Sequence, residues 1–100
     1  MKVTFAPSAK RDLAALYNYL KRFGFERADK TMIEIRAAAV LLGDFPELGI
    51  ERFGWPSDYR SRVVGQNIIV YQITDRVRIL NVVDSRRDVE RMFRKKGKRN

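Results

Sequence analysis

The chain has 100 residues, 45% of them hydrophobic and 33% charged, which fits a single domain with its own core. It contains neither cysteine nor histidine. This composition excludes disulfides and thiolate zinc sites, and it removes the side chain that titrates near neutrality. No apolar run approaches the roughly 18 residues that span a bilayer, and the N-terminus lacks the features of a signal peptide. We therefore expect a cytoplasmic protein without a metal, a cofactor or a membrane contact.

The net charge of +9 is concentrated in the second half of the chain. Residues 1–59 hold nine basic and eight acidic side chains, a balance of +1, whereas residues 60–100 hold twelve and four, a balance of +8. Such asymmetry is typical of a protein that binds an acidic partner, either a nucleic acid or an acidic protein segment.

The first half of the chain predicts one short strand and two helices. Residues 2–5, KVTF, alternate as a strand does, and Ser8 is placed to cap a following helix. That helix extends from Ala9 to a stop at Gly24, and a second helix extends from about Glu26 to Leu42. The apolar face of the second helix comprises Ala28, Met32, Ile35, Ala39 and Leu42, and Ile33, Ala37, Val40 and Leu41 are expected to widen this face. Gly43 is expected to end the helix.

The second half changes to the two-residue period of strands. After a loop over residues 44–58 with two prolines and two glycines, strands are predicted at 59–64, 68–73 and 77–83, joined by tight turns. The middle strand, IIVYQI, is apolar almost throughout, as expected of a strand buried on both faces. The order β-α-α-β-β-β predicts an α+β domain in which an N-terminal strand and an αα-hairpin pack on a small antiparallel sheet. We expect one domain over residues 1–94, with a short helical or disordered C-terminal end, and a disordered basic tail over residues 95–100.

The residues permit one catalytic hypothesis, cleavage of RNA through its 2′-hydroxyl. That reaction needs a base, an acid and cations for the phosphorane. Tyr71 or Glu90 would transfer the proton, and the cations would be Arg60, Arg62, Arg78 and Arg86. Arginine is a poor base because it stays protonated, and Tyr71 is expected to be a core aromatic whose hydroxyl is hydrogen-bonded. The carboxylates are scattered, and Asp12 and Glu34 are expected on solvated helix faces.

Four segments carry spaced residue types in chain order: A-x-x-D-L-x-x-[IL]-x-x-Y in the first helix, L-x-x-x-P-x-L-G after the second, R-x-x-x-V-G-x-x-x-I-x-Y in the strands, and I-x-x-V-x-x-x-R-x-D near the end. They comprise Ala9, Asp12, Leu13, Leu16 and Tyr19; Leu42, Pro46, Leu48 and Gly49; Arg60, Val64, Gly65, Ile69 and Tyr71; and Ile79, Val82, Arg86 and Asp88. Together they resemble the ParE/RelE toxin superfamily over nearly the whole chain.

The resemblance implies the toxin of a type II toxin–antitoxin pair. Its antitoxin would be acidic, ParD-like or similar, and would form a hetero-oligomer with it by wrapping the toxin with a segment that folds on binding. RelE-like members cleave messenger RNA in the ribosome, whereas ParE-like members inhibit DNA gyrase. Asp84 stands where many relatives carry a histidine, and Phe93 stands where RelE-type sequences place a tyrosine. These departures favour the ParE-like branch.

Three functions remain open at this stage. A ParE-type inhibitor would bind gyrase, a non-enzymatic role, through Arg86, Arg87, Arg91, Arg94, Lys95 and Lys96. In that case Arg86 and Arg87 also have a local alternative role, offsetting nearby acidic side chains. A RelE-type endoribonuclease would use the residues named above, and a basic binding module would not be toxic. For the antitoxin we predict contacts at Phe53, Trp55, Arg60 and Arg62, although a loop tryptophan more often closes the edge of a core.

Overall fold

The structure is a computed structural model that describes residues 1–94. The predicted order of strands and helices is confirmed, as is the α+β class. The elements are β1 (Val3–Phe5), α1 (Pro7–Leu20), the 3₁₀ turn η1 (Lys21–Phe23), α2 (Phe25–Asp44), the 3₁₀ turn η2 (Pro46–Leu48), β2 (Tyr59–Val64), β3 (Asn67–Ile73), β4 (Val77–Asp84) and the short helix α3 (Val89–Met92). The tail predicted over residues 95–100 lies outside the described residues.

The four strands form one sheet in the order β1-β4-β3-β2. Strands β2, β3 and β4 are antiparallel neighbours, as predicted. Strand β1 pairs parallel to β4, with Val3 opposite Val77, so the sheet is mixed. A parallel pair needs a long connection between its strands, and here the helical hairpin, β2 and β3 all separate β1 from β4.

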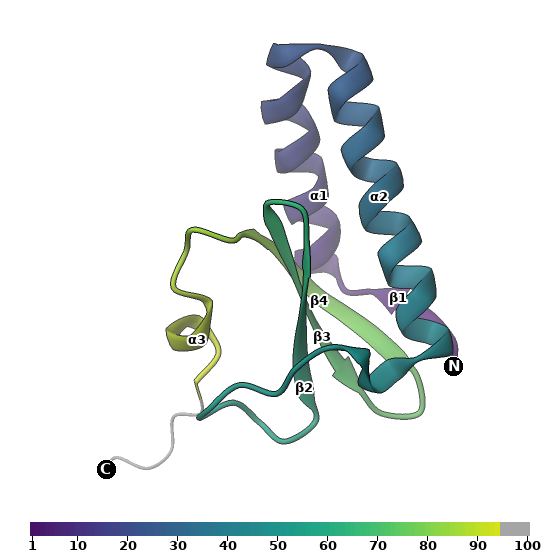
Figure 1. The fold of residues 1–100 in the computed structure, drawn as a ribbon, viewed down its shortest axis with the longest axis vertical. Coiled ribbons are helices and arrows are strands. Elements are labelled where there is room, and N and C mark those ends of the chain that lie inside the picture. The colour runs from purple at the N-terminus through teal and green to yellow at the C-terminus, as the bar shows by residue number, and fades with distance from the viewer. Residues whose placement is uncertain (95–100) are drawn as a thin grey trace.

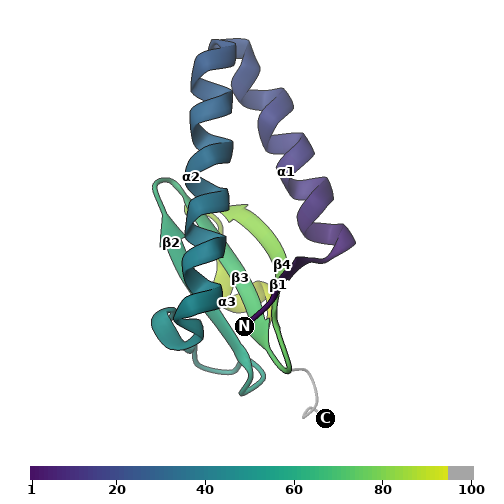
Figure 2. The same ribbon diagram turned by 90° about the vertical axis from the view of Figure 1, so that its right-hand side faces the viewer.

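The helical hairpin lies on one side of the sheet and α3 on the other (Figure 1). Its far end reaches well beyond the turn between β2 and β3, so only the lower part of the hairpin covers strands, which the view in Figure 2 confirms. Within residues 1–94, none of the helices combines the length and apolar character that crossing a membrane requires.

One apolar cluster packs on each face of the sheet. The first lies under the hairpin and contains Ala9, Ile35, Ala39, Leu42, Ile69, Tyr71, Val77, Ile79 and Val82. The second lies on the opposite face and contains Trp55, Ile68, Val70, Val83 and Val89. Strand β3 contributes to both clusters, which confirms that its apolar run is buried on both faces.

The start of α1 differs from the prediction. The helix begins at Pro7, with Ala6 as its N-cap residue. Proline suits this first helical position because its missing N–H would be unpaired there in any case. Ser8 is therefore not the cap, and its hydroxyl donates to the backbone carbonyl of Leu80 instead.

The end of α2 also differs, because Gly43 lies within the helix rather than after it. A Cβ at this position would stand 2.8 Å from both the carbonyl oxygen of Met1 and Cγ2 of Val3. The glycine therefore permits close packing of α2 on the N-terminal segment. The prediction that Ile33, Ala37, Val40 and Leu41 belong to the buried face of α2 was also wrong, because all four are exposed.

Beyond the end of β1, backbone groups on the same edge of β4 are hydrogen-bonded by the start of α1. The backbone N–H of Ala6 donates to the carbonyl of Ile79 over 2.8 Å. Further along, Oδ2 of Asp12 accepts from the backbone N–H of Val82 at 2.9 Å and from the side-chain amide of Asn81 at 3.0 Å. Asp12 is thus a strand-edge partner, not the solvated side chain that its sequence pattern predicted.

We predict that Asp12→Ala lowers the free energy of unfolding by about 1–3 kcal/mol, because it leaves the amide of Val82 without an acceptor. Asp12→Asn keeps one side-chain oxygen acceptor and should cost less than half as much. Urea unfolding measures both losses, and hydrogen exchange at the Val82 amide localises them. Equal losses for the two variants would contradict the role assigned to this carboxylate.

Candidate functional site

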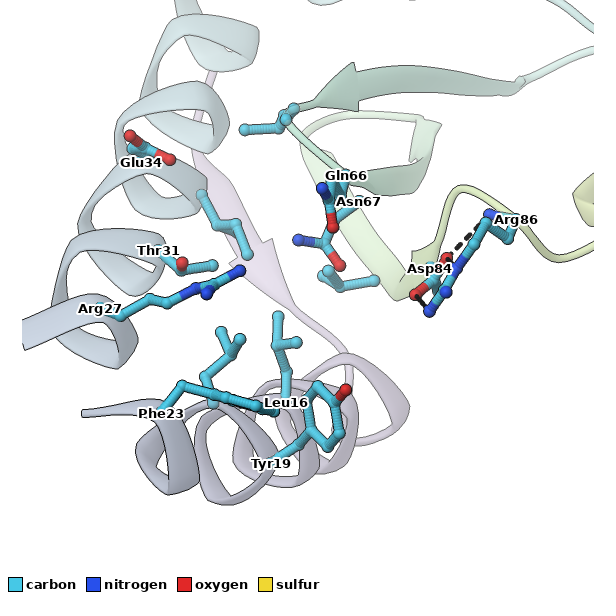
Figure 3. A pocket seen from close by; sticks show the side chains of 15 residues that line it. Leu16, Tyr19, Phe23, Arg27, Thr31, Glu34, Gln66, Asn67, Asp84 and Arg86 are labelled. Atoms are coloured by element: carbon cyan, nitrogen blue, oxygen red, sulfur yellow. Dashed lines mark hydrogen bonds and ion pairs between the residues drawn. The ribbon is translucent and has the colours of Figure 1, made fainter. Parts of the chain in front are cut away.

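A groove lies between the helical hairpin and the end of the sheet (Figure 3). Its volume is about 440 Å³. One wall comes from α1, η1 and α2, and the other from the β2–β3 turn and the end of β4. The lining includes Leu16, Tyr19, Leu20, Phe23, Arg27, Thr31, Glu34, Ile35, Val64, Gln66, Asn67, Val82, Asp84 and Arg86. We call it the hairpin–sheet groove.

The groove has an apolar floor and a polar rim. Leu20, Ile35 and Val82 are buried at its base. On the hairpin wall the exposed rings of Tyr19 and Phe23 meet edge to face with their centroids 5.4 Å apart. Such a concave, mixed lining suits apolar side chains of a bound segment whose polar groups reach the rim.

Asp84 and Arg86 form an ion pair at the mouth of the groove. The guanidinium donates to the two carboxylate oxygens over 2.9 and 2.7 Å, and the backbone N–H of Arg86 donates to the same carboxylate over 2.8 Å. These bonds lower the pKa of Asp84 to about 2. The charge of Arg86 is therefore offset locally, as the alternative role predicted for this residue requires.

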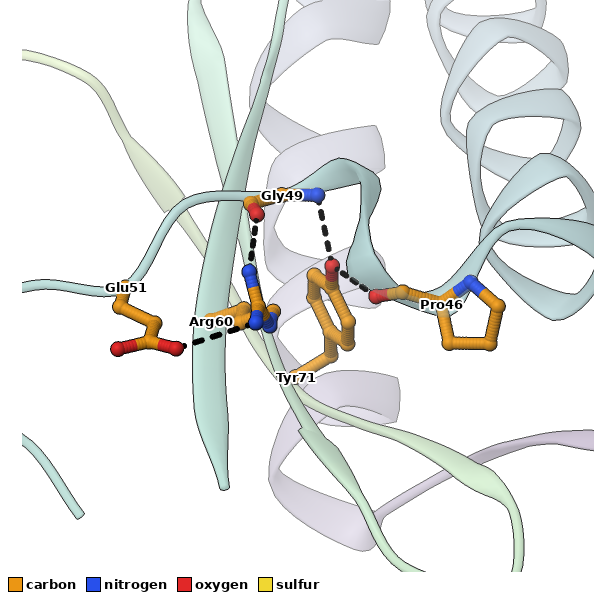
Figure 4. Close-up of polar contacts among 5 residues, drawn as sticks. All are labelled: Pro46, Gly49, Glu51, Arg60 and Tyr71. Carbon is orange, nitrogen blue, oxygen red and sulfur yellow. Dashed lines mark hydrogen bonds and ion pairs between the residues drawn. The ribbon is translucent and has the colours of Figure 1, made fainter. Parts of the chain in front are cut away.

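The hydroxyl of Tyr71 is held in the core by the turn at η2 (Figure 4). It donates to the carbonyl of Pro46 over 2.6 Å and accepts from the backbone N–H of Gly49 over 2.9 Å. Arg60 secures the same turn, because its guanidinium donates to the carbonyl of Gly49 at 2.9 Å and to Glu51 at 3.1 Å. Burial raises the pKa of Tyr71, and the Gly49 N–H only partly opposes this shift. A fully buried hydroxyl with both partners occupied is poorly placed to transfer a proton to a substrate.

The structure brings Arg60, Arg62 and Tyr71 of the ribonuclease hypothesis near one another, but it does not bring the other three residues to them. Arg60 and Arg62 pair with Tyr71 and Ile69, so their side chains share the hairpin face of the sheet. Arg78 lies between two residues of that cluster on β4 and therefore points to the opposite face. Arg86 follows the end of β4, and Glu90 lies on α3.

Trp55 closes the second apolar cluster beneath α3. Only 6% of it is exposed, its indole N–H donates to the carbonyl of Glu90 over 2.9 Å, and Phe93 packs edge to face against it at 5.3 Å. These side chains therefore cover part of the sheet face opposite the hairpin. Among the predicted antitoxin contacts, Trp55 lies in the core, Arg60 is engaged with the η2 turn, Arg62 is partly buried, and Phe53 is 85% exposed.

The predicted target-binding residues gather at the end of the described chain. Arg87, Arg91 and Arg94 are exposed around α3, whereas Lys95 and Lys96 lie outside the described residues. The backbone N–H of Arg91 donates to Asp88, which caps α3. Across residues 1–94, no three acidic side chains gather closely enough to hold a metal ion.

The sequence profile described as "ParE toxin of type II toxin-antitoxin system, parDE" matches residues 3–89. The chain belongs to this ParE toxin family. Membership implies a toxin of a type II toxin–antitoxin system and an antitoxin partner. No curated protein matches the chain at a significant level.

Among solved structures, this ParE-family chain is similar to one titled "Chromosomal ParDE TA system from P. aeruginosa". The TM-score is 0.72 at 19% identity, and the alignment covers 84% of this chain and 95% of the other. At this identity the likeness concerns the fold alone, and it agrees with the β-α-α-β-β-β order.

The sequence did not predict two features of this structure, the groove and the role of Asp12. The hairpin–sheet groove left no local signal, because its walls come from segments tens of residues apart. The role of Asp12 had a partial signal, since Asp12 belongs to the family pattern of the first helix while its charge alone suggested solvent.

We predict that Tyr71→Phe lowers the free energy of unfolding by about 1–3 kcal/mol, because Gly49 and Pro46 lose their buried partner. Tyr17→Phe is a matched control, since the Tyr17 hydroxyl bonds Asp29 in an exposed position. Its cost should stay within about 0.5 kcal/mol. Urea unfolding of both variants tests this, and similar losses would show that Tyr71 has no special structural role.

We also predict that Arg86→Ala raises the pKa of Asp84 from about 2 toward the ordinary value of about 3.9. A depressed pKa means that the pair favours folding above the ordinary value and loses this effect as the pH falls toward 2. Because the pair is exposed, the change in overall stability should be small. Carboxyl NMR titration measures the shift. Arg87→Ala, which removes a weaker influence on the same carboxylate, should move it less.

Proposed function

We propose that this chain is a ParE-type toxin that binds and inhibits DNA gyrase in the cytoplasm, without catalysing a reaction. The observation that carries the proposal is the bonding of Tyr71. Its hydroxyl, the proton-transfer group of the ribonuclease hypothesis, is buried and occupied by Pro46 and Gly49. The family match supports the ParE-like branch over the RelE-like branch.

The partly covered sheet face and the separation of the arginines add independent support. A nuclease needs an open surface on which cations and an acid–base pair converge on one phosphate. Here Trp55 and α3 cover part of the face opposite the hairpin, and the candidate arginines are distributed over both faces. The chain also has no histidine to transfer a proton at neutral pH.

The antitoxin is proposed to place an amphipathic segment in the hairpin–sheet groove. The exposed rings of Tyr19 and Phe23 and the apolar floor would receive its apolar side chains. An acidic segment would be attracted by the surplus of +8 in residues 60–100. Phe53 and Arg62 lie away from the lining of this groove, so they would contact a further part of a wrapping segment.

The target surface is proposed to be the basic end around α3, with Arg87, Arg91 and Arg94 exposed there. Exposed charges at the rim of an interface mainly speed association and give it salt dependence. Gyrase or the DNA that it holds would supply the opposite charge.

We predict that the purified chain inhibits supercoiling by gyrase and that Arg87→Glu/Arg91→Glu weakens this inhibition by about tenfold, equivalent to about 1.4 kcal/mol. Arg11→Glu/Lys10→Glu, on exposed positions of α1, removes the same net charge elsewhere and should have less effect. A supercoiling assay at two salt concentrations measures both.

The RelE-like alternative, a ribosome-dependent mRNA endonuclease, predicts the opposite result. In a translation reaction the chain would cut transcripts inside ribosomes and leave supercoiling unchanged. That outcome would refute the gyrase proposal. A chain without effect in either assay and without toxicity in cells would instead be a binding module.

A further inference from the structure

Helix α2 has an apolar face that nothing within residues 1–94 covers. Ile33 is 68% exposed, Val40 61% and Leu41 39%, and Ala37 between them is also exposed. They lie on the side of α2 opposite Ile35, Ala39 and Leu42, the residues through which α2 packs into the core on the sheet. A helix that is apolar on two opposite sides is normally buried on both.

The spacing of this face is that of a helix-pairing seam. Lys30, Ile33, Ala37, Val40 and Asp44 follow one another at intervals of three, four, three and four residues. This repeat keeps side chains on one line along a helix and is the pattern by which two helices pack. Ala37 at its middle is small enough for a second helix axis to approach closely.

The local charge identifies the kind of helix that fits. Residues 25–44 hold four acidic and three basic side chains, a balance of −1. The other residues therefore carry +10, which gives the net charge of +9 for the whole chain. An acidic antitoxin segment is therefore not attracted to this face as it is to the basic half. A second copy of the chain, in contrast, would bring a nearly neutral surface against a nearly neutral surface, with the basic ends elsewhere.

The seam is also complementary to itself when reversed. In an antiparallel pair with its two-fold axis at Ala37, Ile33 lies against Val40 and Leu41 of the partner subunit. At the ends of the seam, Lys30 lies opposite Asp44 of the partner subunit. A two-fold interface makes each of these contacts twice, so it unites two apolar contacts and two ion pairs in one register.

We infer that this chain self-associates as an antiparallel dimer through the outer face of α2. The helix has 20 residues and is about 30 Å long, so one helix pair buries less than the roughly 1,600 Å² of a standard interface. The dimer is therefore weak, with a dissociation constant on the order of micromolar. The groove uses a different side of α2, at Arg27, Thr31 and Glu34, so it stays open in the dimer.

Sedimentation velocity of the purified chain over a range of concentrations tests the inference. The chain should shift from the monomer mass of 11.7 kDa toward twice that mass, and Val40→Glu should abolish the shift. Lys30→Glu and Asp44→Lys should each weaken dimerisation by about tenfold, since each places like charges opposite one another at both ends. The double variant Lys30→Glu/Asp44→Lys should restore it, because the ion pairs are re-formed with reversed polarity. Arg11→Glu, an exposed charge reversal on α1, should change little.

Three results would overturn the inference. The chain could remain a monomer at the highest concentration reached. The charge exchange could fail to restore a dimer in a double variant that circular dichroism shows to be folded. Finally, the unbound chain could be monomeric while Val40→Glu abolishes binding to its antitoxin, which would assign the α2 face to the antitoxin. Because the dimer does not depend on gyrase inhibition, a negative supercoiling assay leaves this test unaffected.

Discussion

Strand β3 packs under the helical hairpin on one face and against Trp55 and Val89 on the other, and this double burial constrains every other element. Both layers must be present for the strand to be stable, because four of its seven residues are buried. The C-terminal segment is thereby placed as α3 over part of the face opposite the hairpin. The arginines within the strands are divided between the two faces, since Arg60 and Arg62 lie on the hairpin face and Arg78 lies on the opposite one.

The same constraint explains why the family pattern is largely structural. Tyr71 projects from the doubly buried strand, so its hydroxyl must be bonded inside the protein, and the η2 turn supplies both partners. Gly49 has to be glycine there, since a Cβ would lie 2.5 Å from that hydroxyl and 2.7 Å from the carbonyl oxygen of Ser61. Arg60 then binds the carbonyl of Gly49. Residues that are far apart in the sequence are thus linked in one network that joins α2 to the sheet.

Periodicity predicted the elements of the fold because each strand and helix leaves a local repeat, and the apolar run of β3 predicted its own burial. The predictions that failed depend on which segment packs against which. Ser8 and Asp12 look like a cap and a surface charge until β4 is placed beside α1, and Gly43 looks like a helix stop until the N-terminal strand lies against it. The apolar residues on the outer side of α2 were assigned to the core for a similar reason. Composition shows that a residue is apolar but not whether its partner belongs to the same chain. The hairpin–sheet groove was missed because no single segment contains it.

The distribution of charge separates the surfaces that this small chain offers. The outer side of α2 is nearly neutral, the groove has a mixed polar and apolar lining, and several arginines are exposed around α3. Asp84 and Arg86 stand where the groove meets the basic end, and their pairing keeps a carboxylate ionised beside the arginines. An acidic segment in the groove would compete with Asp84 for Arg86 and would lower the positive potential of the neighbouring surface. With the target surface proposed at α3, occupation of the groove would therefore weaken binding of a negatively charged target even where the two surfaces do not overlap.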